Sequence, residues 1–125
     1  MFSAKDTSHP TYNSIPGRYV NRISNAQYTI DGVTYHTEKN DGKNTLHSGT
    51  KNWSYRVWSV TALSDSSITF SLADTANSSM GMPGLVNANV TYSVTDSKWN
   101  INMVATAPQA RTREYTMAFC SNTYG

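Results

Sequence analysis

The stretch that decides the fold runs from Val86 to Thr106 and reads VNANVTYSVTDSKWNINMVAT. Its first part alternates apolar residues with Asn, Thr and Ser, and a similar alternation resumes after the polar break Asp96-Ser97-Lys98. A period of two places every second side chain on the same face of an extended strand. The pattern therefore predicts two half-buried strands joined by a turn, and no helix in either half.

A second hairpin is predicted closer to the N-terminus. Tyr28 and Ile30 lead into Asp31-Gly32, and Val33 and Tyr35 lead out. Asp-Gly is favoured in two-residue hairpin loops because both loop positions need a positive φ. This register places Tyr28 opposite Tyr35 and Ile30 opposite Val33 on one face.

The remaining pattern also favours an all-β, antiparallel chain. Further strands are expected over Tyr55–Leu63 and Ile68–Leu72, which are rich in β-branched and aromatic residues. Polar clusters at Asn40–Asn44 and Ala76–Gly84 predict loops. Of the three tryptophans, we interpret Trp58 and Trp99 as core residues and not as a sugar-stacking platform.

The composition excludes several classes of function. The net charge of +2 and the absence of a basic run argue against a nucleic-acid partner. No apolar stretch approaches the roughly 18 residues of a membrane helix, and no signal peptide is recognised, so membrane association is not expected and the compartment, extracellular or cytoplasmic, stays open. A single cysteine, Cys120, excludes an intramolecular disulfide.

Metal and cofactor sites are not expected either. The three histidines, His9, His36 and His47, have no metal-ligand spacing, and no phosphate-binding glycine motif occurs. His9 lies in the lead-in, and His36 is on the polar register of its hairpin. Three Asn-x-Ser/Thr sequons, at Asn52, Asn77 and Asn89, are near chance for a chain so rich in Asn, Ser and Thr.

Two short segments have side chains that suit a hydroxyl-rich neutral ligand. They are Gly17-Arg18-Tyr19-Val20-Asn21-Arg22-Ile23 and Asn44-Thr45-Leu46-His47-Ser48-Gly49. A guanidinium offers five donors in a rigid fork, and a neutral imidazole can donate at one nitrogen and accept at the other. Residue types alone leave open a solvated strand arginine and a loop histidine with a backbone partner, and they do not decide between Arg18 and Arg22.

In this order and spacing the two segments resemble the aldose 1-epimerases (galactose mutarotases), which have G-R-x-x-N-R-I and N-x-L-H-G-G. Three further features are similar to family motifs: the Asp31-Gly32 hairpin followed by Tyr35 and Asn40, Trp58 after the histidine loop, and Gly81-Met82-Pro83-Gly84. The resemblance extends over most of the chain, about residues 16–107, and is closest to fungal members.

The resemblance implies a large antiparallel β-sandwich that binds aldohexoses and interconverts their α and β anomers without a cofactor. It assigns substrate contacts to Asn21, Arg22 and His47, and we expect Arg22 and His47 to share one concave surface. Because 125 residues are few for such a sandwich, we interpret 1–125 as a single partial domain. Residues 1–15 are expected to form an extended lead-in and residues 108–125 a divergent tail.

The chain also departs from the family pattern. The histidine loop has Ser48 where the family has glycine. The family's acid is a histidine in S-H-x-Y-[FW]-N, whereas Ser121–Gly125 places Asn122 at that position. The family's base is a glutamate near its C-terminus, and neither Glu38 nor Glu114 lies in a matching motif. We therefore identify no catalytic residue and expect this chain alone to be inactive.

Two alternatives stay open. The first is a catalytically silent carbohydrate-binding β-sandwich module or truncated paralogue, which saturable hexose binding without mutarotation would identify. The second is a generic β-sandwich interaction domain, which failure of the folded protein to bind any hexose would identify. In either case, part of a sandwich leaves an apolar face or an edge strand uncovered, so we expect the isolated chain to associate.

Overall fold

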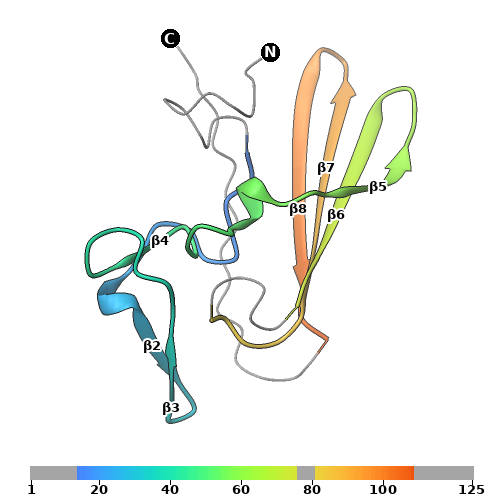
Figure 1. Cartoon of the computed structure of the whole chain (residues 1–125). Coiled ribbons are helices and arrows are strands. Elements are labelled where there is room, and N and C mark those ends of the chain that lie inside the picture. The colour runs from blue at the N-terminus through green and yellow to red at the C-terminus, as the bar shows by residue number, and fades with distance from the viewer. Residues whose placement is uncertain (1–13, 76–80, 109–125) are drawn as a thin grey trace.

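A four-stranded antiparallel sheet contains the hairpin predicted from residues 86–106 (Figure 1). The computed structural model describes residues 14–75 and 81–108. The sheet has the order β5-β6-β7-β8. Its strands are β5 (Ser59–Leu63), β6 (Ser67–Asp74), β7 (Val86–Thr95) and β8 (Lys98–Thr106).

The β7–β8 turn is tighter than the sequence suggested. Thr95 pairs with Lys98, so Lys98 already belongs to β8 and the loop consists of two residues. Asp96 has φ 48° and Ser97 has φ 63°. Two consecutive positive φ values give a turn whose twist matches that of the flanking strands.

The N-terminal hairpin has the register that the sequence predicted. β2 (Gln27–Ile30) pairs with β3 (Val33–His36), with Tyr28 opposite Tyr35 and Ile30 opposite Val33. The two tyrosine rings stack with their centroids 5.5 Å apart. Asp31 and Gly32 form the loop with φ 50° and 78°, and His36 is exposed as expected.

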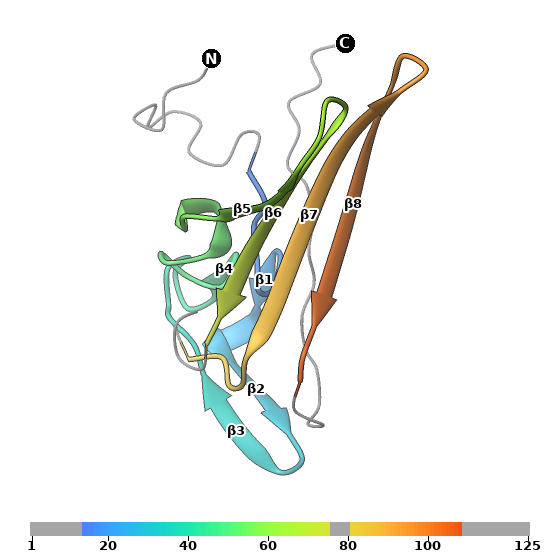
Figure 2. The same ribbon diagram turned by 90° about the vertical axis from the view of Figure 1, so that its right-hand side faces the viewer.

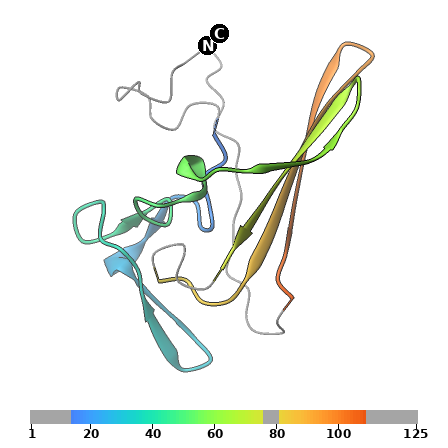
Figure 3. The ribbon, with the colours of Figure 1, turned by 45° about the vertical axis from the view of Figure 1, so that its right-hand side comes forward.

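The other short elements lie on one side of the large sheet. They are β1 (Arg22–Ile23), the 3₁₀ turn η1 (Ser24–Ala26), β4 (Thr45–Leu46) and the 3₁₀ turn η2 (Trp53–Tyr55). Figures 2 and 3 show this loop-rich half against one face of the sheet, with the β2–β3 hairpin pointing away from it. All sheets of the described residues are antiparallel, which confirms the all-β expectation.

One predicted strand begins later than expected. Tyr55 belongs to η2, and β5 starts only at Ser59. The cause is Asn52, whose side chain accepts a hydrogen bond from the Ser54 N–H at 2.9 Å and so caps the 3₁₀ turn. The Asn52 side chain is also buried, so this sequon is not accessible to a glycosyltransferase in the folded chain.

The core lies between the loop-rich half and the apolar face of the sheet. Its buried members are Ile15, Trp53, Leu72, Val86, Ala88 and Val90. The alternation in β7 places Val86, Ala88 and Val90 on this face, as predicted. Ile15 falls in the segment that we expected to be an extended lead-in, yet it is part of the core.

The three tryptophans have different environments. Trp53 is completely buried, and Trp58 packs edge-on against it with ring centroids 6.0 Å apart. The prediction that Trp99 is a core residue is wrong, because Trp99 is 60% exposed and stacks on Tyr92. It is the second residue of β8, next to the β7–β8 turn. This turn lies at the end of the sheet that projects beyond the loop-rich half (Figure 3).

Some sequence predictions concern residues outside the described ranges. They are His9, Asn77, Glu114, Cys120 and Asn122, together with most of the lead-in and the tail. Within the ranges that are described, no helix has the length and apolar character needed to cross a membrane.

Candidate functional site

Strands β1 and β4 bring the two candidate segments together. Arg22 pairs with Leu46, and one step along the ladder His47 donates its backbone N–H to the Asn21 carbonyl at 2.9 Å. The Asn21 N–H in turn donates to Nδ1 of the His47 ring at 3.2 Å. Three residues that are distant in sequence, Asn21, Arg22 and His47, are therefore neighbours on one short strand pair.

The surroundings of the His47 ring select one tautomer of the neutral imidazole. Nδ1 accepts a hydrogen bond from a backbone N–H, so in the neutral ring the proton is on Nε2. Burial, and secondly the positive charge of Arg22, lower the pKa of His47 from its ordinary value. Both effects favour the neutral ring, whose hydrogen-bond donor is then Nε2–H.

The loop that presents His47 has unusual backbone geometry. His47, Ser48 and Gly49 have φ values of 51°, 64° and 97°. Asn40 holds the preceding residue, because its side chain accepts from the Leu46 N–H at 2.7 Å and donates to the Leu46 carbonyl at 2.9 Å. A side-chain amide here forms the two bonds that a neighbouring strand would otherwise provide.

The Arg22 side chain is exposed, but an ion pair with Asp41 orients it. Its Nε donates to Oδ2 of Asp41 at 2.6 Å, and 57% of its side chain is accessible. An exposed ion pair contributes at most about 1 kcal/mol to stability. Its main effect here is to use the Nε edge of the guanidinium, which leaves the Nη nitrogens without a protein hydrogen-bond partner among the described residues.

The two candidate side chains line different hollows. His47 lines one of about 480 Å³ together with Asn40, Leu46, Gly49, Thr50, Asn52 and Tyr55. Arg22 lines another of about 280 Å³ together with Tyr19, Ile23, Ser24, Tyr28, Thr29 and Met82. The expectation of a single concave surface for both stays a prediction.

Arg18, the other arginine that the sequence offered, is held in the protein interior. It is 2% exposed, and its Nε donates to Oδ2 of Asp74 at 3.1 Å. Its Nη groups donate to the backbone carbonyls of Asp74, Pro83 and Gly84 at 2.9, 2.6 and 3.0 Å. The Nε and both Nη nitrogens of the guanidinium therefore donate hydrogen bonds within the protein.

Asp74 is the centre of this network, and the sequence analysis did not identify it. Its carboxylate is fully buried and also accepts from Nε1 of Trp53 at 2.8 Å and from Nη1 of Arg56 at 3.1 Å. The available signal was an aspartate on the buried register at the end of the apolar strand β6. Asp74 joins the sheet to the segment that precedes Asn21 and Arg22.

Glu38 also has a structural role. Its carboxylate accepts from the backbone N–H of Thr50 at 2.6 Å and from the Thr50 hydroxyl at 3.0 Å. Its backbone carbonyl accepts from the Thr45 hydroxyl at 2.6 Å. Glu38 thus holds both ends of the histidine loop, between β4 and η2.

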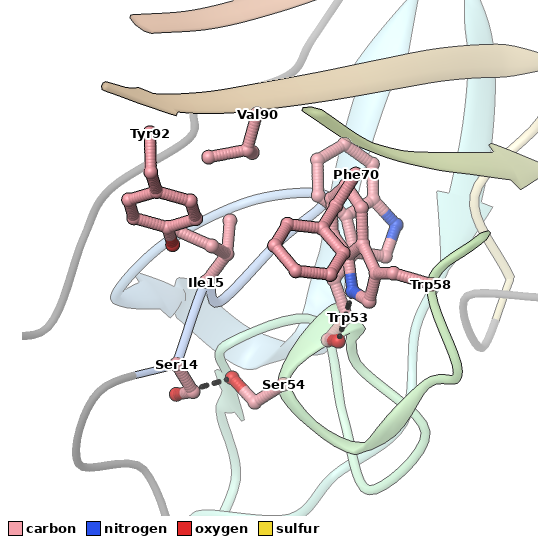
Figure 4. Close-up of a pocket in the computed structure, with 8 residues that line it drawn as sticks. All are labelled: Ser14, Ile15, Trp53, Ser54, Trp58, Phe70, Val90 and Tyr92. Carbon is pink, nitrogen blue, oxygen red and sulfur yellow. Dashed lines mark hydrogen bonds between the residues drawn. The ribbon is translucent and has the colours of Figure 1, made fainter. Parts of the chain in front are cut away.

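A third hollow, of about 320 Å³, lies against the sheet (Figure 4). Figure 4 shows four aromatic rings around it, those of Trp53, Trp58, Phe70 and Tyr92, and the Trp58 indole N–H donates to the Trp53 carbonyl at 3.2 Å. Its lining includes the core residues Ile15, Trp53 and Val90 and does not include His47 or Arg22. In the part of the chain that the structure describes, no three His, Cys, Asp or Glu side chains gather in a potential metal site.

Comparison with known proteins links this geometry to one family. The family model described as aldose 1-epimerase matches residues 2–119. A probable aldose 1-epimerase of Arthroderma benhamiae is 46% identical over 93 residues, which cover 73% of this chain and 21% of the relative. The aldose 1-epimerase of Escherichia coli is 38% identical over 80 residues, which cover 64% of this chain and 23% of the relative.

A solved structure has the same fold. The crystal structure of an aldose epimerase homologue from C. elegans superimposes with a TM-score of 0.72 at 33% identity. The match covers 78% of this chain and 30% of the other. In these comparisons the chain spans between about a fifth and a third of the length of its relatives.

Proposed function

The chain belongs to the aldose 1-epimerase family, and from this premise we propose that it supplies sugar contacts of an aldohexose site. The contacts are the Asn21 amide, the Arg22 guanidinium and the His47 imidazole. The observation that supports the proposal is the β1–β4 pairing, which makes neighbours of the residues that the family pattern assigns to the substrate.

The chemistry of these groups suits a hexose. The Nη nitrogens of Arg22 can donate to vicinal hydroxyls or to a ring oxygen. The Nε2–H of His47 can donate to a sugar oxygen, and the exposed Asn21 side chain can both donate and accept. The Asn21 and His47 side chains are neutral, and the Arg22 cation acts only as a hydrogen-bond donor. This set of groups fits an uncharged substrate.

The proposed role does not include catalysis by the described residues. Anomer interconversion needs an acid that protonates the ring oxygen and a separate base that removes the proton of the anomeric hydroxyl. His47 has a lowered pKa and is a poor acid near neutrality. The Glu38 carboxylate accepts hydrogen bonds from Thr50 and holds the histidine loop, so we do not assign it the role of the base.

Isothermal titration calorimetry with D-galactose and D-glucose tests the binding. We expect saturable binding that His47→Ala and Arg22→Ala each weaken by roughly tenfold or more, the effect of losing a hydrogen bond to a charged or buried polar group. His36→Ala is the matched control, because His36 is exposed and lies on a different strand pair. Equal binding by all three variants would contradict the site assignment.

Polarimetry tests the catalytic part of the proposal. Fresh α-D-galactose should equilibrate at the buffer rate in the presence of the 125-residue chain. Positioned acid–base groups typically accelerate a reaction by about 10²–10⁴-fold, so their presence would be obvious. Acceleration that His47→Ala abolishes would show that His47 is a catalytic acid and that the proposal is wrong.

A further inference from the structure

Ser48 connects the histidine loop to the arginine segment through two hydrogen bonds. Its Oγ accepts from the backbone N–H of Tyr19 at 2.6 Å and donates to the backbone carbonyl of Tyr19 at 2.9 Å. Ser48 is 1% exposed, so both bonds are shielded from water. One hydroxyl therefore satisfies both polar groups of a single backbone residue.

This Ser48 bridge lies beside the contact that orients the His47 ring. Tyr19 is bound by Ser48, and Asn21, two residues later, is bound by His47 through both its N–H and its carbonyl. The two consecutive loop residues thus fix the backbone of 19–21 at two points. Both sets of bonds hold the segment that presents the Asn21 N–H to Nδ1 of His47.

The backbone at this position indicates that the hydroxyl itself matters. Ser48 has φ 64°, in the left-handed region where a side chain costs free energy relative to glycine. Glycine would therefore suit the backbone better here. The two hydrogen bonds of the hydroxyl offset this cost, which gives the serine a role that glycine cannot fill.

We propose that Ser48 is a positioning residue that holds His47 with Nδ1 as an acceptor and Nε2–H as its donor toward a ligand. The ring then donates a hydrogen bond to an oxygen of the sugar, either the ring oxygen or a hydroxyl oxygen. It does not accept a hydrogen bond from a sugar hydroxyl. The relevance to sugar rests on the proposed function, whereas the hydrogen bonds that support the inference do not involve a sugar.

NMR of the full 125-residue chain tests the inference with Ser48→Ala and Ser48→Gly. In the wild type, His47 ring nitrogen shifts should show Nδ1 unprotonated and Nε2 protonated. In both variants the Nε2–H share of the neutral ring should fall, and the Tyr19 and Asn21 amides should exchange with solvent up to about tenfold faster. Ser54→Ala is the control, because Ser54 is a partly buried serine whose hydroxyl binds Ser14 and not this segment.

Each outcome decides the inference. Wild-type ring shifts and exchange rates in both variants, with a native amide spectrum, would overturn it. Loss of the native spectrum in both variants would also overturn it, because Ser48 would then support the fold in general. Failure of the wild type to bind hexose would refute the proposed function and leave the result for the His47 ring unaffected.

Discussion

At the scale of single residues, Arg22 and His47 interact before any ligand binds. The positive charge of Arg22 is the second cause, after burial, of the lowered His47 pKa. We expect Arg22→Gln to raise this pKa, because the substitution removes a charge that disfavours the imidazolium. An NMR titration of the His47 ring protons measures the change.

Lys98→Gln is the control for this titration. It also removes one positive charge, but from the first residue of β8, beside the turn at the end of the large sheet. We expect no change in the His47 pKa from this variant. An unchanged pKa in Arg22→Gln would show that the charge of Arg22 does not act on the His47 ring.

The lowered pKa also gives stability a pH dependence with a definite sign. The unfolded chain binds a proton at His47 more readily than the folded chain does. The contribution of His47 to the free energy of unfolding is therefore present above the unfolded value of about 6.5 and is lost as pH falls through the folded pKa. Denaturant titrations of wild type and His47→Gln between pH 5 and 8 check this. The free energy of unfolding of wild type minus that of His47→Gln should fall as pH falls, and a rise toward low pH would contradict the prediction.

Asp74 should be the most sensitive single position. Asp74→Asn removes the charge that pairs with buried Arg18, and breaking a buried ion pair costs about 3–5 kcal/mol. Urea unfolding measures the loss. Asp65→Asn, at an exposed aspartate in the β5–β6 turn, should change the free energy of unfolding by less than about 0.5 kcal/mol. Similar effects of both substitutions would contradict the role of the network.

Residue types alone could not separate Arg18 from Arg22. Both lie in one seven-residue segment, and their roles differ because Asp74, more than fifty residues later, pairs with Arg18 and not with Arg22. Ser48 was noticed as a departure from a pattern, but its two bonds to Tyr19 became visible only in three dimensions. Long-range partners of polar side chains have no local sequence signal.

At the scale of secondary-structure elements, the two hairpins were predictable because turn chemistry and alternation are local. The Asp31-Gly32 and Asp96-Ser97 loops have the positive φ values that such turns require. The start of β5 differs from the prediction because the β-branched and aromatic residues Tyr55, Val57 and Trp58 suggested a strand. The Asn52 cap instead stabilises a 3₁₀ turn there.

The β7–β8 turn offers a test at this scale. Ser97 has φ 63°, so Ser97→Gly should stabilise the chain by roughly 0.5–1 kcal/mol, the left-handed penalty minus the entropy cost of glycine. Ser93→Gly in the interior of β7 should destabilise it, because glycine weakens a strand. Thermal unfolding of both variants is the measurement, and a lower melting temperature for Ser97→Gly would contradict the turn geometry.

At the scale of the whole molecule, the apolar face of the large sheet extends beyond the loop-rich half that covers it (Figure 3). Leu63 pairs with Ile68, Ile68 with Tyr92, and Val94 with Trp99, which places these side chains on the same face as the core. Leu63, Val94 and Trp99 are among the exposed large apolar residues. The sequence predicted the alternation but not how much of this face would be covered.

The part of this face that the described residues leave exposed should drive association of the isolated chain. We expect Leu63→Lys combined with Trp99→Lys to raise the monomer fraction, measured by light scattering across a concentration series. Asn102→Lys, on the opposite face of β8, should leave the association unchanged. A wild-type chain that stays monomeric at all concentrations would show that the exposed apolar surface is tolerated.

The claim that this chain supplies a hexose site is tested most directly by mapping where a sugar binds. In a ¹H–¹⁵N NMR titration with D-galactose, we expect saturable shifts centred on the amides of Asn21, Arg22 and His47, with residues around the aromatic hollow of Figure 4 largely unaffected. Saturable shifts confined to that aromatic hollow, or no saturable shifts at all in a folded sample, would contradict the account.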